Sequence, residues 1–515
     1  MITSFFRKIK VKESFIILAL AIYFIVLFLM FFRSGDYAEA ANMKESYRYL
    51  IILAQFGACG VIVLLAKSKL RDFIVAHHIK ILIGIFTVAI AIRIIFIFAI
   101  AVNLTYAEDF GRYLKYTEVL TTTGGQGFSP DVLKYISIFP HIIGTPIIMS
   151  SFLSITGYSL TNYLLINSIF GILSGVVIYF IMKQVFSKSA ALISVLVWGI
   201  NPLCITYEMF TSEVSILTLL SLLAILLWIK VLNQKNFKLV LLYTVLFGIV
   251  CAIAQFVRPV AIIFIIAALL TMFIYKKNTV LSVKQMFRNS KVAANLLIAV
   301  IIVVTFSICN HALKLKIESY TNNKLPSQRI GYNLYVGSTL EREGQWTATA
   351  EKFFRQKMTE LNPTELHEFF LKEGLNNYKE NGIVNNLNLF HDKLEIITNH
   401  TVEKPVLFIY KGIEKASPDI AETANKYNVW INMVCVIFVS FNYACAALGA
   451  IGIWLKYKKS KHIDSGIFMM VLMFVGVMIS SLLFEVSFRY TYFVVLLPIL
   501  LVPGIFGFIK RKPIS

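Results

Sequence analysis

The sequence has few charged residues for its length. Only 15% of its 515 residues are charged, whereas 58% are hydrophobic, and the mean hydropathy is +0.74. A soluble globular chain carries more charge and less apolar surface than this. A water-soluble fold is therefore excluded, and the composition predicts a polytopic membrane protein.

Cysteine is also scarce, and its positions indicate neither a metal site nor a disulfide framework. The six cysteines fall in or beside apolar runs, and none shows the CxxC spacing of a metal site. A disulfide framework and a zinc site are therefore not expected. The chain also lacks a glycine-rich nucleotide loop, and every loop predicted to be cytoplasmic is short and basic, which argues against a cytosolic nucleotide substrate.

Long apolar runs of about 20 residues, the length that crosses a bilayer, recur along the chain. They predict about twelve crossings, at 15–32, 50–66, 81–102, 160–182, 190–207, 214–231, 239–256, 260–275, 292–309, 429–455, 467–483 and 492–509. The middles of these runs are almost free of charge, whereas polar residues gather at their ends.

Lysine and arginine clusters predict the orientation. With twelve crossings, every cluster between the spans falls on one side, which the positive-inside rule assigns to the cytoplasm together with both termini. The first run is full length and lacks a small-residue cleavage site, so it is not expected to be a cleaved signal. The stretch 312–426 holds 15 Lys/Arg and 15 Asp/Glu, so the net charge of +21 lies in the helix flanks. Membrane lipids are expected partners and nucleic acid is not.

The segment 136–155 is apolar but does not fit this count. One further crossing there would move every later basic cluster to the outside. Pro140 and Pro146, with Gly144 between them, also make an uninterrupted spanning helix costly. The segment is therefore predicted to be re-entrant or to lie in the membrane interface.

The predicted fold is an all-α integral membrane protein with one outer, extracytoplasmic soluble domain. Residues 1–80 hold two N-terminal helices, 81–311 a transmembrane core with a functional outer loop at 104–159, 312–426 the outer domain, and 427–515 the C-terminal helices. Within the outer domain, 349–360 and 363–379 are predicted to be short amphipathic helices. Gly331, Gly337 and Gly344 indicate a loop before them.

Charged residues recur at the outer rim from distant parts of the sequence. Glu108, Asp109 and Arg112 follow the span 81–102, and other outer turns contain Glu208, Glu213, Arg258 and Arg489. A site between helices explains this recurrence economically. Simpler alternatives stay open at this point, because Asp109 fits a solvated loop carboxylate, the arginines fit snorkelling anchors and Glu213 fits a helix cap.

On the outer face, where nucleotide sugars and ATP are scarce, an activated donor is most plausibly a lipid. Transfer from a polyprenyl-phosphate sugar needs a carboxylate to accept the acceptor hydroxyl's proton and cations to stabilise the departing phosphate. Asp109 is the candidate base, supported by Glu108. Arg112, Arg258 and Arg489 are the candidate phosphate-binding guanidiniums. No ligand spacing demands a metal, and a divalent ion bridging the phosphate and the acidic pair stays open.

The order of these elements resembles the GT-C fold glycosyltransferases that use polyprenyl-phosphate donors, particularly bacterial members of glycosyltransferase family 39, which are related to protein O-mannosyltransferases. The resemblance rests on Asp109 with Tyr113, the Gly124–Pro130 link, Phe139-Pro140-His141, Glu213, Arg258-Pro259, the stretches 331–337 and 344–346, and Arg489-Tyr490. It covers roughly residue 81 to the C-terminus.

The resemblance implies an inverting hexosyl transfer at an extracytoplasmic site in the cell membrane, with Asp109 as the base. Tyr113, His141 and Glu213 join the predicted substrate-binding residues. The acceptor is a glycan, a lipid or a protein. A ligase or polymerase of lipid-linked glycans is the first alternative, and a secondary transporter, which usually shows related halves and polar helix middles, is less favoured.

Overall fold

A computed structural model gives the fold. The structure describes residues 11–33, 76–99, 101–103, 108–274, 291–322, 324–326, 329–416, 446–460 and 463–487, with isolated positions between 50 and 74 and at 441 and 444. Every element assigned within these residues is a helix. The predicted all-α class is therefore confirmed for the described part of the chain.

Six described helices are long and apolar enough to cross a bilayer. They are α6 (His78–Ala99), α10 (Leu160–Val185), α13 (Val214–Asn233), α14 (Phe237–Val257), α16 (Lys291–Thr321) and α21 (Ser465–Leu483). The chain is thus a multi-pass membrane protein. The helix α2 (Val11–Arg33) covers the predicted span 15–32. The span 492–509 and most of 50–66 and 429–455 lie outside the described residues, so the total of about twelve stays a prediction.

The predicted span 190–207 is wrong as a single helix. It divides into α11 (Lys188–Ile200) and α12 (Pro202–Glu208), and Asn201 between them is extended, with φ −67° and ψ 113°. The reason is local, because Pro202 has no amide hydrogen and disfavours a helical conformation at the preceding residue. The interruption makes α12 a separate short helix, which contacts α10, α11, α13 and α19.

The segment around Pro140 is broken, as its prolines predicted. The helix α8 (Pro130–Ile138) meets a short 3-10 turn, η2 (Pro140–Ile143), and α9 (Gly144–Thr156), and the chain bends by 111° between the two helical parts. A side chain at Gly144 would collide with the backbone of Phe256 at the end of α14. Glycine thus allows the bend to lie directly against α14. The re-entrant or interfacial placement of the segment 136–155 stays a prediction.

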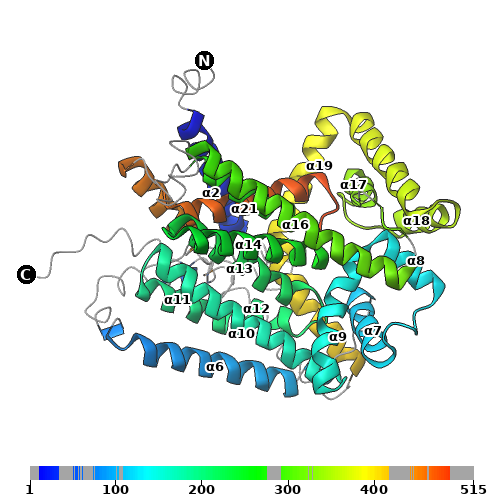
Figure 1. The fold of residues 1–515 in the computed structure, drawn as a ribbon, viewed down its shortest axis with the longest axis horizontal. Helices are drawn as coiled ribbons and strands as arrows, with labels where there is room; N and C mark the ends of the chain where they lie inside the picture. The colour runs from blue at the N-terminus through cyan, green and yellow to red at the C-terminus, as the bar shows by residue number, and fades with distance from the viewer. Residues whose placement is uncertain are drawn as a thin grey trace, which may run out of the picture.

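The membrane helices pack around one continuous apolar core. The helix α10 contacts α6, α11 and α13; α13 contacts α14, α14 contacts α16, and α21 contacts α2 and α15 (Ala261–Ile274). Trp228 and Phe247 lie fully buried at the α13–α14 contact, with ring centroids 5.3 Å apart. Between membrane helices such a contact stabilises through close packing, because lipid tails are as apolar as these side chains. The short helices α7, α8, α9, α17 and α18 gather at one end of this bundle (Figure 1).

The outer region contains three helices and a second apolar core. The helices are α17 (Gly331–Ser338), α18 (Ala348–Glu360) and α19 (Pro363–Ala416), and α19 is kinked at Gly382, where φ is 69°. Their core joins Tyr332, Phe354 and Phe370 to Phe139 from the bend after α8. The outer region is therefore tied to the 130–156 segment by shared packing.

The two predicted helices of this region are confirmed, but the predicted loop before them is partly wrong. Gly331 and Gly337 lie in α17 and not in a loop. Both positions need glycine, because a side chain would collide with the backbone of His367 at Gly331 and of Phe484 at Gly337. Gly344 is a true turn residue with φ +75°. The predicted boundary between 311 and 312 lies inside the continuous helix α16, so a separate outer domain stays a prediction.

Candidate active site

Asp109 lies in the first turn of α7 (Glu108–Thr123), where the helix dipole favours a carboxylate. Its Oδ1 accepts a hydrogen bond from Nη1 of Arg112 at 3.0 Å. The side chains are 34% and 43% exposed, respectively. Asp109 is thus an ion-paired carboxylate that solvent, and hence a substrate hydroxyl, can reach. The side chain of its neighbour Glu108 lies outside what the structure describes.

Arg112 connects α7 to α8. Its Nη1 donates to the hydroxyl of Tyr135 at 3.3 Å, and its guanidinium lies over the Tyr135 ring, 5.4 Å from the centroid. Partial burial lowers the pKa of Arg112, but the oxygens of Tyr135 and Asp109 outweigh it, and the net pKa lies above the ordinary value. Arg112 therefore stays a cation. Tyr113, the next residue, is buried with 7% of its surface exposed.

Arg258 and Glu213 form a second ion pair at the same end of the bundle. Arg258 caps α14 and Glu213 precedes α13, and Nη1 of Arg258 donates to Oε1 of Glu213. Their side chains are only 13% and 4% exposed. The charge of Arg258 is therefore partly compensated by a carboxylate from the neighbouring turn.

His141 lies in η2, which contacts both α7 and α14, the helices of Asp109 and Arg258. It lines one cavity together with Arg329. The structure thus brings together predicted site residues that are far apart in the sequence. Arg489 lies outside the described residues, so its predicted role stays a prediction.

A small cavity adjoins His141. It is lined by Pro140, His141, Phe256, Asn310, Leu313, Lys314, Ile317 and Arg329. Sequence reasoning missed Arg329, which stands in the linker before α17 and belongs to no motif. Burial lowers the pKa of Arg329, while the charge of Glu318 opposes this effect. A guanidinium with reduced hydration beside a histidine and a lysine is suited to binding an anion.

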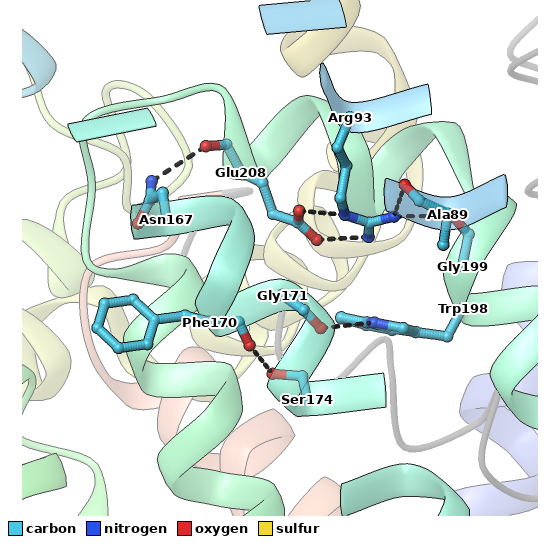
Figure 2. A network of polar contacts seen from close by, with 9 residues as sticks. All are labelled: Ala89, Arg93, Asn167, Phe170, Gly171, Ser174, Trp198, Gly199 and Glu208. Atoms are coloured by element: carbon cyan, nitrogen blue, oxygen red, sulfur yellow. Dashed lines mark hydrogen bonds and ion pairs between the residues drawn. The ribbon is translucent and has the colours of Figure 1, made fainter. Parts of the chain in front are cut away.

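Arg93 was also missed. It lies inside the apolar helix α6, six residues before Ala99, or about 9 Å from the helix end. The side chains of Arg93 and Glu208 are only 1% and 4% exposed, and two hydrogen bonds of 2.6 and 2.7 Å join them (Figure 2). The expectation that helix middles are nearly free of charge is therefore wrong here. The sequence did contain a signal for Arg93, because it is a lone charge in a long apolar run.

No group of three or more potential metal-ligating side chains occurs within the part of the chain that the structure describes. Asp109 is paired with Arg112, and Glu213 with Arg258. The described residues thus do not form a metal centre by themselves.

Residues 141–308 match a family model described as dolichyl-phosphate-mannose-protein mannosyltransferase. The match covers about a third of the chain, and over this segment the chain is similar to that glycosyltransferase family. The matched segment begins at His141 and includes α9 to α15 and most of α16. It therefore contains Glu213 and Arg258, whereas Asp109 and Arg329 lie outside it. The family resemblance inferred from the sequence is confirmed.

Two solved structures share a similar arrangement. They are the apo oligosaccharyltransferase of Archaeoglobus fulgidus, with 14% identity and a TM-score of 0.43, and the archaeal oligosaccharyltransferase AglB from Archaeoglobus fulgidus in complex with an inhibitory peptide and a dolichol-phosphate, with 13% identity and a TM-score of 0.41. They cover 82% and 85% of this chain, and the chain spans about half the length of each. No curated protein matches the chain.

Proposed function

We propose that this protein is a membrane glycosyltransferase that moves a sugar from a polyprenyl-phosphate donor to an acceptor on the outer face of the membrane. The similarity of residues 141–308 to a mannosyltransferase family supports the reaction class. The observation that carries the assignment of the site is the packing of η2, which holds His141, against α7 and α14, which hold Asp109 and Arg258 at their ends. A carboxylate and several cations at one end of the bundle are the groups that this transfer needs.

Asp109 is the general base in this proposal. The acceptor hydroxyl oxygen bonds to the anomeric carbon while the bond from that carbon to the phosphate oxygen breaks. The hydroxyl proton passes to the Asp109 carboxylate, and the polyprenyl phosphate leaves with the bonding electrons. Attack opposite the leaving group inverts the anomeric centre. Arg112 orients the carboxylate through its 3.0 Å hydrogen bond.

The departing phosphate needs positive charge, and two arginines are candidates. Arg258 retains a partner in Glu213, so its net contribution is reduced. Arg329 faces the cavity with His141 and Lys314, and a phosphate there gains from the incompletely hydrated guanidinium. We therefore assign the main phosphate contact to Arg329, with Arg258 in support. Arg489, Tyr113 and Glu108 remain proposed contributors.

The polyprenyl chain would reach the cavity from the side of α16. The apolar 18-residue window of this helix is only 6% buried inside the protein, so α16 presents most of its surface outward, toward lipid. Leu313 and Ile317 of α16 line the same cavity as Arg329. This combination of basic side chains and an exposed apolar helix matches the chemistry of a ligand with a phosphate head and a hydrocarbon tail. The cavity has the size of a water molecule, so its walls must move apart to admit the phosphate.

The test is sugar transfer by purified full-length protein in liposomes. Radiolabelled polyprenyl-phosphate mannose, glucose and galactose are offered one at a time, with a lipid-linked oligosaccharide as a fourth donor. Consumption of a monosaccharide donor by wild type, lost in Asp109→Asn with donor binding retained, supports the proposal. Consumption of the oligosaccharide alone moves the protein to the ligase class. Consumption of none, or full activity of Asp109→Asn, refutes the assignment of Asp109.

A further inference from the structure

The buried pair Arg93–Glu208 makes hydrogen bonds beyond those that join its two side chains. Besides its two contacts with Glu208, Arg93 donates through Nη1 to the carbonyl of Ala89 at 3.1 Å and to the carbonyl of Gly199 at 2.9 Å. These contacts join α6, α11 and α12 through one side chain (Figure 2). An ionised pair away from water persists only when its hydrogen-bonding groups are satisfied in this way.

Glu208 is also fixed from the side of α10. The amide of Asn167 donates to the backbone carbonyls of Glu208 at 3.1 Å and Phe210 at 2.7 Å. Gly171 leaves room for the carboxylate, because a side chain at that position would collide with it. The indole of Trp198 donates to the Gly171 carbonyl at 3.1 Å. Glu208 therefore has one position, set by three helices.

The chain that follows Glu208 leads directly to the proposed catalytic groups. The hydroxyl of Thr211 donates to the carbonyl of Phe110 at 2.6 Å, and Phe110 is the residue after Asp109. The rings of Phe110 and Phe210 stack with centroids 4.7 Å apart. Two residues further along, Glu213 pairs with Arg258. The turn 208–213 thus touches both the Asp109 side and the Arg258 side of the site.

We infer that Arg93, Glu208 and Thr211 are positioning residues for this reaction: the buried ion pair anchors the turn 208–213, and Thr211 holds the start of α7 so that Asp109 faces the donor. This inference rests on the proposed function for its catalytic readout. None of the three residues needs to touch the substrate. Displacing a catalytic group by about 1 Å costs about 100-fold in rate.

The first test removes the single hydrogen bond between the turn and α7. Thr211→Val keeps the shape of the side chain and loses the donor, whereas Thr211→Ser keeps the donor. Thr218→Val is the matched control, because Thr218 is a buried threonine of α13 whose hydroxyl has no hydrogen-bond partner. We expect kcat to fall about 10-fold to 100-fold in Thr211→Val with an unchanged donor KM. Thr211→Ser and Thr218→Val should behave as wild type.

The second test separates positioning from folding. The double variant Arg93→Met with Glu208→Leu replaces the ion pair by apolar groups, a change that often preserves stability. We expect it to fold, with a wild-type melting temperature, and to show the same loss of kcat as Thr211→Val. Wild-type kcat in this folded double variant would mean that the ion pair has only a structural role.

Hydrogen–deuterium exchange decides the inference without any donor. The peptide covering 108–116 should exchange faster in Thr211→Val and in the double variant than in Thr218→Val. If exchange and kcat in Thr211→Val match those of Thr218→Val, the inference is overturned while the proposed function stands. If wild type consumes no donor, the proposed function fails, but the exchange experiment still tests the anchoring of α7 by the turn. Faster exchange in Thr211→Val supports that anchoring, and unchanged exchange overturns it.

Discussion

Two arginine–carboxylate pairs of this protein differ most in their access to water. Arg93 and Glu208 are 1% and 4% exposed, whereas Arg112 and Asp109 are 43% and 34% exposed. The first pair is bidentate and enclosed by helices, and the second joins neighbouring turns of one helix at 3.0 Å. A carboxylate enclosed by its partners cannot take a proton from a substrate. The comparison therefore supports the proposal that Asp109 carries the chemistry and that Glu208 anchors the turn.

The largest expected effect is on turnover. Asp109→Asn should lower kcat by about 100-fold to 10,000-fold, because the amide cannot accept the hydroxyl proton. The melting temperature should stay that of wild type, since a half-exposed ion pair contributes little stability. Glu118→Gln, at an exposed acidic residue of the same helix α7, is the control. Equal turnover in Asp109→Asn and Glu118→Gln would show that Asp109 is not the base.

Glu208→Gln should show the opposite pattern. It leaves Arg93 as an uncompensated buried charge, and breaking such a pair costs about 3–5 kcal/mol. Equilibrium unfolding in mixed micelles of a mild detergent and SDS measures this loss. The same measurement on Glu118→Gln should give a free energy of unfolding within about 0.5 kcal/mol of wild type. A Glu208→Gln protein as stable as wild type would contradict the anchoring role.

Arg329→Gln tests a third environment, a partly buried arginine that faces the cavity. Removing a charged hydrogen bond to phosphate should weaken binding by about 1.5–3 kcal/mol, or roughly 10-fold to 150-fold in Kd. Binding of polyprenyl phosphate and of inorganic phosphate is measured by calorimetry, and Arg342→Gln, at an exposed arginine, is the control. Weakened binding of both ligands indicates a phosphate contact, and unchanged binding of both refutes it.

Lys393 extends the comparison to a buried cation in α19. Its Nζ donates to the carbonyls of Leu482 at 2.8 Å and Phe484 at 3.0 Å. Burial lowers the pKa of Lys393 to about 7, partly offset by Glu485. Since the unfolded chain binds this proton more tightly, stability should rise between pH 7 and 10, by at most about 1.4 kcal/mol per pH unit.

The matched pair for this prediction lies on the same helix. Lys393→Met should lose the rise in the free energy of unfolding with pH, and Lys379→Met, at an exposed lysine, should keep it. Unfolding titrations at several pH values between 7 and 10 measure the slope. An unchanged slope in Lys393→Met would show that another group carries the dependence.

The smallest effect is expected for Arg112→Gln on stability. Its pair with Asp109 is half-exposed, so its loss should cost less than about 1 kcal/mol. Turnover should still fall, because Asp109 loses the hydrogen bond that orients it. A loss of stability as large as that of Glu208→Gln would contradict the view that only the buried pair anchors the fold.

Much of the fold could be predicted from the sequence, because it depends on local signals. The apolar runs gave helices α6, α10, α13, α14 and α21 within a few residues of their observed ends. The break at Pro140 followed from the missing amide hydrogen of proline. The break at Pro202 followed from the same rule but was overlooked, since the surrounding run is long enough to span.

The candidate site was predicted only in part. Asp109, Glu213 and Arg258 were predicted as charges at one depth and His141 from the family resemblance, and the structure brings them to one end of the bundle. Arg329 carries no motif, and its place in the cavity depends on how the linker after α16 folds back. Arg93 was visible as a lone charge, but nothing in the sequence named its partner.

The sequence by itself determined that the chain lies in a membrane, where most described helices begin and end, and which charges lie near helix ends. These depend on hydrophobicity and backbone chemistry within short windows. The tertiary structure alone decided that Arg93 pairs with Glu208, 115 residues away, and that Arg258 pairs with Glu213, 45 residues away. Such pairs depend on the relative register of packed helices, which the whole core fixes and no local window encodes.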